Sequence, residues 1–154
     1  ADYPLREVGR GDLRWLGLGV YEASLWTRSG RYDGLDVPEP MALSLWYQRR
    51  FTRAQLVEIT TGEWERLGLA DAPTRARWQA VLERIWSDVE RGDNMTAVVL
   101  PGRETRFYDA DRLLGRVEDP AFGRAYLAIW LDPRTAVRGL RTRLLGSAAN
   151  RSST

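Results

Sequence analysis

The stretch LRWLGLGVYEASLW, residues 13–26, is an almost unbroken run of apolar and aromatic side chains with an arginine at its second position. A run of this kind predicts a strand from Arg14 to Trp26 that is buried on both faces. A buried guanidinium without a partner is costly, so we expect Arg14 to be held by an opposite charge. The sequence leaves open whether that charge belongs to the protein or to a ligand.

Side chains alternate along a strand, which assigns the neighbours of Arg14. Its own face carries Leu16, Leu18 and Val20. Tyr21 lies on the other face and is expected in the core. One alternative for Arg14 is an internal ion pair, with Asp12, with Glu22 or with an acidic residue of a covering helix. The other is a ligand carboxylate, because the planar guanidinium can bind both of its oxygens.

The length and composition of the chain predict a single globular domain. The chain has 154 residues, of which 44% are hydrophobic, and a domain of this size buries about two thirds of its unfolded surface. We expect that domain to span residues 1–146 and to be followed by a disordered polar tail, residues 147–154. The net charge is only +2, from 23 basic and 21 acidic residues. Without a basic run, we expect no nucleic-acid partner.

The chain contains no histidine, cysteine or lysine, and this absence excludes several classes of site. It removes the Ser-His-Asp and Cys-His constellations, thiolate and imidazole metal sites, haem ligation through histidine or cysteine, and Schiff bases. Only Asp, Glu, Tyr, Ser, Thr and Arg remain for catalysis. We therefore expect no metal and no other cofactor.

The sequence also bears on location. No segment approaches the roughly 20 apolar residues of a membrane span, and we expect no transmembrane segment. The sequence begins at Ala1 without a methionine, which predicts either a trimmed chain or a cleaved leader of about 15 to 30 residues. Since a cysteine-free chain suits an oxidising compartment, we expect a periplasmic or secreted protein, with the cytoplasm as the alternative.

The first half of the chain predicts a second strand and then a helix. The strand spans Ala42–Arg49 and follows a loop, residues 27–40, whose glycines and prolines mark it as exposed. Thr52 and Gln55 have the spacing of a capping box. They predict a helix that ends at Gly68.

A second helix and a strand meander are predicted next. The helix is expected from Pro73 to Arg91, with Gly92 as its stop. Its apolar residues recur at helical spacing: Trp78, Val81, Leu82, Ile85, Trp86 and Val89. Residues 95–117 then predict three strands, separated by a type II turn at Pro101–Gly102 and a turn at residues 109–111.

The last part of the chain predicts two helices. The first begins at Asp119–Pro120, with the aspartate as N-cap and the proline at the first helical position. Its apolar face carries Phe122, Tyr126, Ile129 and Trp130. The second covers residues 136–145. Strands, helices, strands and helices in this order predict an α+β fold with the helices on one face of a largely antiparallel sheet.

Several short motifs resemble the chalcone isomerase-like family, and its bacterial branch more closely than the plant enzymes. They span residues 8–146, in the order LGLGVYEASLW, GEWERLG, IWSDVERGD, DPAFGRAYLAIWLDP and LRTRLLG. The resemblance implies an open-faced β-sandwich, in which a large antiparallel sheet is covered on one face by helices. In that family the cleft between sheet and helices binds a flat phenolic substrate in the enzymes, or a fatty acid in the plastid binding proteins.

The resemblance argues against chalcone isomerase activity. The enzymes use an arginine, a threonine, a tyrosine and an asparagine. Matching the motifs places Leu16 at the threonine, Thr52 at the tyrosine and Ile59 at the asparagine. Each lost donor to the developing enolate typically costs about 2.7 to 4 kcal/mol. Arg14 is our hypothesis for the arginine, with Arg10 as the alternative.

These observations lead to a predicted ligand site and function. The ligand-binding residues are predicted to be Arg14, Leu16, Leu18, Tyr47, Arg49, Thr52 and Ile59. Around Tyr47, the alternative interpretation is a strand that emerges into solvent. The leading prediction is non-catalytic binding of a fatty acid or another amphipathic carboxylate. One alternative is an isomerase or intramolecular lyase that uses Arg14 and Tyr47 on an unknown substrate. The other is a scaffold protein whose cleft is filled by its own side chains.

Overall fold

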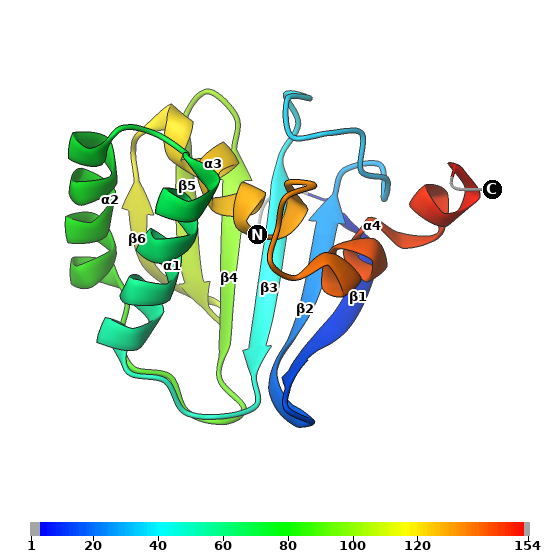
Figure 1. The fold of residues 1–154 in the computed structure, drawn as a ribbon. Coiled ribbons are helices and arrows are strands. Elements are labelled where there is room, and N and C mark those ends of the chain that lie inside the picture. Colours follow the sequence, from blue (N-terminus) through cyan, green and yellow to red (C-terminus); the bar gives the residue numbers. More distant parts are fainter. Residues whose placement is uncertain (1–3, 153–154) are drawn as a thin grey trace.

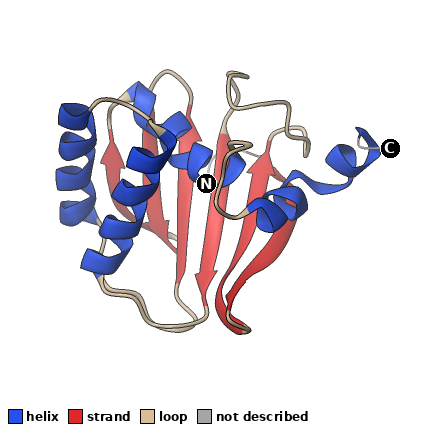
Figure 2. Cartoon of the chain, viewed as in Figure 1, coloured by secondary structure: helices blue, strands red, loops and turns tan. Residues whose placement is uncertain are grey.

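The computed structural model describes residues 4–152, and the side chains of residues 4–146. Within this range the elements are β1 (Arg6–Trp15), β2 (Leu18–Thr27), β3 (Met41–Tyr47), α1 (Arg53–Leu67), α2 (Ala72–Ile85), β4 (Asn94–Leu100), β5 (Glu104–Asp109), β6 (Arg112–Val117), α3 (Pro120–Leu131) and α4 (Arg138–Ser152). The six strands form one antiparallel sheet in the order of the chain (Figure 1). The helices lie on one face of this sheet (Figure 2). The predicted α+β class and layer order are confirmed.

The first predicted strand is instead a hairpin. The chain reverses at Leu16–Gly17, with φ angles of 52° and 78°, and Trp15 pairs with Leu18 across the turn. Two consecutive positive φ values define a type I′ turn, the connection that best matches the twist of paired strands. The prediction of one continuous strand from Arg14 to Trp26 is therefore wrong. The apolar run is not a single buried strand, because Leu16 and Gly17 reverse the chain in solvent.

A register shift separates the tip of this hairpin from its base. Leu13 pairs with Tyr21 but Arg14 pairs with Gly19, so Val20 has no partner on β1. This bulge and the turn together break the alternation on which the predicted face of Arg14 depended. Arg14 and Leu16 do not share a buried strand face.

The strand meander and its turns agree with the sequence. Arg103 N–H donates to the carbonyl of Leu100 at 3.1 Å. Gly102 between them has φ 72°, as a type II turn requires. The next connection reverses the chain at residues 110–111, because Asp109 pairs with Arg112.

Helix starts were predicted better than helix ends. Both hydrogen bonds of the capping box at Thr52 are present, and Asp119 caps α3 as expected. The second helix, however, stops at Ile85 rather than Arg91. Beyond it Val89 forms a two-way bridge with Phe51, with N–O distances of 2.9 and 3.0 Å. This bridge takes backbone groups that a longer helix would have used, so tertiary pairing overrides the helical periodicity.

The core forms where α3 lies on β4 and β5. All but three of its twelve residues are buried, and Gly123 approaches so closely that a Cβ would overlap Val99. Phe122 packs with Phe107 and Trp64 in edge-to-face geometry, at centroid distances of 6.0 and 5.7 Å. Trp64 Nε1 also donates to the carbonyl of Ala125 at 3.2 Å. These contacts hold α1 against α3.

The C-terminal helix lies over β1. Gly146, with φ 72° and ψ −166°, interrupts α4, and a Cβ there would overlap the carbonyl of Val8. The side chains of the predicted tail, residues 147–154, lie outside the described part of the chain, so its disorder stays a prediction. Within residues 4–152, no helix has the length and apolar character needed to cross a bilayer.

Candidate functional site

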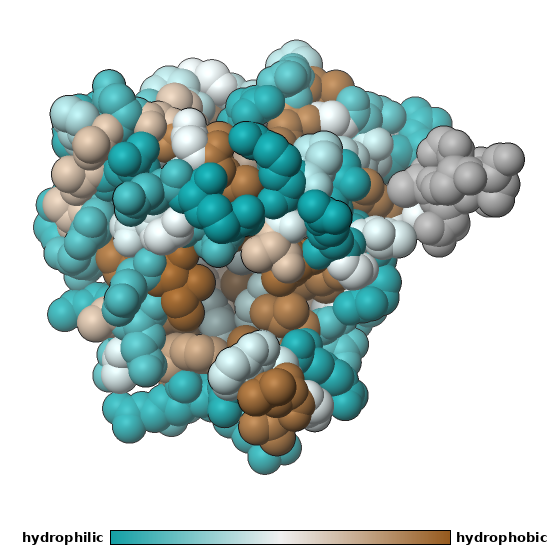
Figure 3. Space-filling view, in the orientation of Figure 1, coloured by the Kyte–Doolittle hydropathy of each residue, from teal (hydrophilic) through white to brown (hydrophobic). Residues whose placement is uncertain are grey.

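A cavity of about 190 Å³ lies between the sheet and the helical layer. Helix α1 packs on α2 and α3 rather than on the strands, which leaves space between α1 and the first three strands. Figure 3 shows a hollow on this side of the molecule, with hydrophobic side chains on either side of it. The lining residues come from β1–β3, α1, α3 and the connections around them: Leu13, Val20, Tyr21, Leu45, Tyr47, Phe51, Leu56, Ile59, Thr60, Glu63, Trp86, Tyr126, Ile129, Trp130, Thr135, Ala136 and Val137.

Three of the residues with polar groups in the cavity lining are tyrosines. Burial raises the pKa of Tyr21 to about 12, although Trp130 Nε1 donates to its hydroxyl at 2.8 Å. Burial also raises the pKa of Tyr47 and of Tyr126. Within the described residues, no hydrogen bond engages the hydroxyl of Tyr47 or Tyr126. All three side chains are therefore neutral near pH 7, and two hydroxyls are free to donate to a ligand.

The electrostatics of the cavity do not favour a deeply buried anion. Among the described residues, Glu63 is the only charged one in the lining, and it is paired with Arg66 at 2.9 Å. None of the arginines between residues 4 and 146 lines the cavity. A carboxylate placed among the tyrosines would lose its hydration without gaining a cation, which is costly. The interior therefore suits an apolar group or a neutral hydrogen-bond acceptor.

The predicted site residues fall into separate places. Tyr47 and Ile59 line the cavity. The Thr52 hydroxyl instead accepts the Gln55 backbone N–H at 3.1 Å and caps α1. Leu16 lies at the tip of the β1–β2 turn and is 81% exposed. The other three predicted residues line a surface hollow outside the cavity: Arg14, Leu18 and Arg49.

Arg14 forms an ion pair within the protein, which was one of the two alternatives. Its Nε lies 3.2 Å from Asp12 Oδ2, and the two side chains are 68% and 41% exposed. The pair is thus a surface pair, not the buried one that the sequence suggested. Arg14 also borders a groove that shares Leu13 and Val137 with the cavity lining. The guanidinium lies outside the cavity, close to one side of it.

Sequence reasoning placed several lining residues in the core and missed their role. Tyr126, Trp130 and Trp86 were assigned to apolar helix faces, and Tyr21 to the core. All four are largely buried, so periodicity could not separate packing from lining. The available signal was chemical, because buried Tyr and Trp carry a polar group that usually needs a partner. Trp86 Nε1 has none within the described residues.

The described residues hold no cluster of three or more acidic side chains that could bind a metal ion. Among the described residues that line the cavity, Glu63 is the one carboxylate that could act as a general base near the tyrosines. Its side chain accepts two hydrogen bonds from Arg66. The chemistry of the cavity is that of an apolar pocket with neutral hydrogen-bond donors.

Comparisons with known proteins agree with this architecture. The structure is similar to that of a fatty-acid binding protein from Arabidopsis thaliana, with a TM-score of 0.71 and 14% sequence identity, over 100% of this chain and 92% of that one. At this identity the likeness is one of fold. A comparison with curated protein sequences finds no match. Residues 9–146 match the family model described as chalcone isomerase-like. The chain belongs to the chalcone isomerase-like family.

Proposed function

We propose that this protein binds a fatty acid or another small amphipathic molecule in the cavity between sheet and helices, without converting it. The observation that carries the proposal is the cavity itself, which is apolar and is not filled by the protein's own side chains. A dry cavity of about 150 Å³ with apolar walls can hold a benzene molecule. A cavity of about 190 Å³ therefore has room for a ring or a short acyl segment. The fold it shares with a fatty-acid binding protein supports the same proposal.

The charges around the cavity favour one orientation of such a ligand. The apolar tail occupies the interior, where burial of each methylene contributes about 0.8 kcal/mol. The carboxylate stays outside, in the groove beside Leu13 and Val137. The charged residues in the lining of this groove are three arginines and one aspartate, so it is net positive: Arg14, Arg138, Arg143 and Asp12. Glu63, which lines the cavity elsewhere, repels a carboxylate from its side. Arg14 thus keeps its proposed role as a ligand contact, at the entrance and not inside.

The alternatives have less support. An isomerase that combines Arg14 with Tyr47 needs both groups on one substrate, and only Tyr47 lines the cavity. A pure scaffold needs a filled cleft, whereas this one has space. We also keep the proposals of bacterial origin and a periplasmic location. Cell fractionation of the source organism tests the location.

Native mass spectrometry of protein purified without denaturation tests the proposal directly. We expect a defined mass increment that disappears after delipidation and returns on addition of a fatty acid. The variant Arg14→Met should weaken fatty-acid binding by about tenfold or more, the scale of a lost charge-assisted hydrogen bond. Its stability should change by less than about 1 kcal/mol, because the ion pair with Asp12 is exposed.

Arg103→Met is the matched control, since Arg103 is an exposed arginine in the β4–β5 turn. It should bind fatty acid like the wild type. If Arg14→Met loses stability but binds normally, Arg14 serves the fold and its proposed contact with the ligand is incorrect. If the delipidated wild-type protein binds no fatty acid, the proposed function fails.

A further inference from the structure

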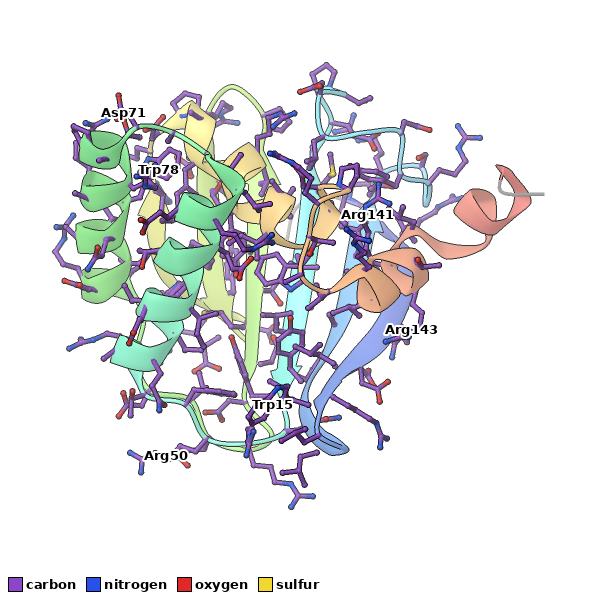
Figure 4. All side chains as sticks on the ribbon, viewed as in Figure 1. Trp15, Arg50, Asp71, Trp78, Arg141 and Arg143 are labelled. Carbon is purple, nitrogen blue, oxygen red and sulfur yellow. The ribbon has the colours of Figure 1, made fainter. Side chains whose placement is uncertain are left out.

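The tip of the β1–β2 hairpin exposes an unusual concentration of apolar side chains. Trp15 is 63% exposed, Leu16 81% and Leu18 56%. They are three of the five large hydrophobic side chains that are exposed within the described residues. Figure 3 shows a hydrophobic cluster at the lower end of the molecule, where Figure 1 places the β1–β2 turn. Figure 4 shows Trp15 at the same end.

The backbone at the tip of the hairpin is strained. Leu16 has φ 52°, a left-handed conformation that costs a leucine roughly 1 to 2 kcal/mol and that asparagine or glycine adopts more easily. Next to it, a Cβ added at Gly17 would meet open space. Neither the geometry of the turn nor packing against other residues favours a leucine at position 16. A residue that is both strained and exposed indicates a role outside the fold.

Three arginines converge beside this tip. Arg14, Arg49 and Arg91 line one surface hollow, together with Leu18 and the Gln48 side chain. Arg14 is paired with Asp12. The ion pairs formed among residues 4–146 do not involve Arg49 or Arg91. The neighbouring Arg50 is neutralised by Asp88 and Glu90. The hollow is therefore net positive.

We propose that this hairpin tip docks on the surface of a bilayer that contains anionic phospholipids. Trp15, Leu16 and Leu18 enter the interfacial region, where tryptophan is favoured. The phosphate and headgroup oxygens are bound by Arg49 and Arg91, whose planar guanidinium groups match phosphate geometry. Apolar insertion combined with basic side chains is the general basis of peripheral membrane binding. Charge complementarity selects the lipid surface over a neutral partner.

The position of the hairpin adds a consequence that rests on the proposed function. Leu13 and Val20 line the cavity and lie on the same hairpin, within three residues of its exposed tip. Docking at the tip thus brings the cavity close to the membrane surface. A lipid-derived ligand then has a short path between the bilayer and the cavity.

Sedimentation with vesicles tests the docking surface. Vesicles of phosphatidylglycerol and phosphatidylcholine should bind the wild-type protein, and pure phosphatidylcholine vesicles should bind it far less. Leu16→Asn keeps the turn and should lower binding about tenfold. The double variant Arg49→Gln and Arg91→Gln should lower it by about fivefold for each arginine, with a weaker dependence on salt.

Matched controls are Leu113→Thr, an exposed leucine at the other edge of the sheet, and Arg103→Gln, in a turn at the opposite end of the strands. Both should bind vesicles like the wild type. The proposal is overturned if the wild-type protein does not bind anionic vesicles, or if the tip variants bind them as well as the controls do. It is also overturned if Leu16→Asn leaves vesicle binding unchanged but abolishes self-association measured without lipid, because the tip then contacts a second copy of the chain. Loss of vesicle binding with normal fatty-acid titration leaves the proposed function intact, so the two failures are distinguishable.

Discussion

Trp130 on α3 donates its indole N–H to the hydroxyl of Tyr21 on β2, at a distance of 2.8 Å. This hydrogen bond joins the helical layer to the sheet, and both side chains line the cavity. Tyr47 also lies on this face of the sheet, with its ring centroid 6.2 Å from that of Tyr21, but its hydroxyl has no partner within the described residues. Tyr21 and Tyr47 thus differ in one interaction, because only the hydroxyl of Tyr21 accepts a hydrogen bond from Trp130.

That difference predicts opposite effects of the same substitution. Tyr21→Phe leaves the Trp130 N–H unpaired and should lower the free energy of unfolding by about 1 to 3 kcal/mol. Tyr47→Phe removes a buried hydroxyl without a partner and should leave stability unchanged or raise it slightly. Urea unfolding of the delipidated proteins measures both. Equal losses in the two variants would show that the hydrogen bond does not stabilise the layer contact.

The buried tyrosines predict a loss of stability at high pH. The pKa of Tyr21 rises from 10.0 to about 12 on burial, so above pH 10 the unfolded chain loses a proton that the folded chain keeps. The stabilisation is complete below pH 10 and is lost as pH rises towards 12. The free energy of unfolding should fall by about 1.4 kcal/mol per pH unit for each such tyrosine. Tyr47 and Tyr126 add to the effect, because burial raises their pKa values as well.

The composition makes this titration easy to interpret. The chain has no lysine or cysteine, and arginine stays protonated below about pH 12. Tyrosine therefore dominates the change in charge above pH 10. Phenolate absorbance of the folded protein, together with urea unfolding at pH values on both sides of 10, provides the measurement. Ionisation of all six tyrosines near pH 10 in the folded state would contradict the buried cluster.

Two glycines on different helices predict opposite responses to alanine. At Gly123 a Cβ would overlap Val99 and the Thr105 hydroxyl, so Gly123→Ala should destabilise the protein by about 1 to 3 kcal/mol. Gly62 on α1 has open space around it, and Gly62→Ala should stabilise by about 0.5 to 1 kcal/mol. Thermal unfolding compares the pair. A neutral Gly123→Ala would mean that α3 lies farther from the sheet.

The turn at the hairpin tip predicts a stabilising variant. Leu16→Asn places a residue that favours positive φ in the first position of a type I′ turn. We expect the free energy of unfolding to rise by about 1 kcal/mol, the lower end of the strain for leucine. Urea unfolding measures the change, with Leu113→Thr as a control at an exposed strand position. A destabilised Leu16→Asn would show that Leu16 makes contacts that its 81% exposure conceals.

The sequence was informative where local chemistry acts alone. The capping box at Thr52, the Asp119 cap and the turn at Pro101–Gly102 depend on neighbours in the chain, and the structure contains all three. Together with the helical periodicity, these signals were enough to predict the α+β order.

The sequence was least informative where contacts between distant parts of the chain determine the local structure. The end of α2 depends on the bridge between Phe51 and Val89, residues that are distant in sequence. The turn at Leu16 has no strong local signal, because leucine rarely adopts positive φ. As a result the predicted site around Arg14 was placed on the wrong strand geometry. Tyr126 and Trp130 carry the same periodicity whether they fill a core or line a cavity.

The central claim is that the cavity holds the apolar part of an amphipathic ligand, and calorimetric titration with saturated fatty acids of increasing length tests it most directly. For the delipidated wild type, affinity should rise by about 0.8 kcal/mol per methylene and then level off once the cavity of about 190 Å³ is filled. Ile59→Trp, which adds bulk at an exposed lining position, should abolish the rise, whereas Ile59→Ala should retain it. Affinity that is independent of chain length, or that Ile59→Trp leaves unchanged, would contradict the account.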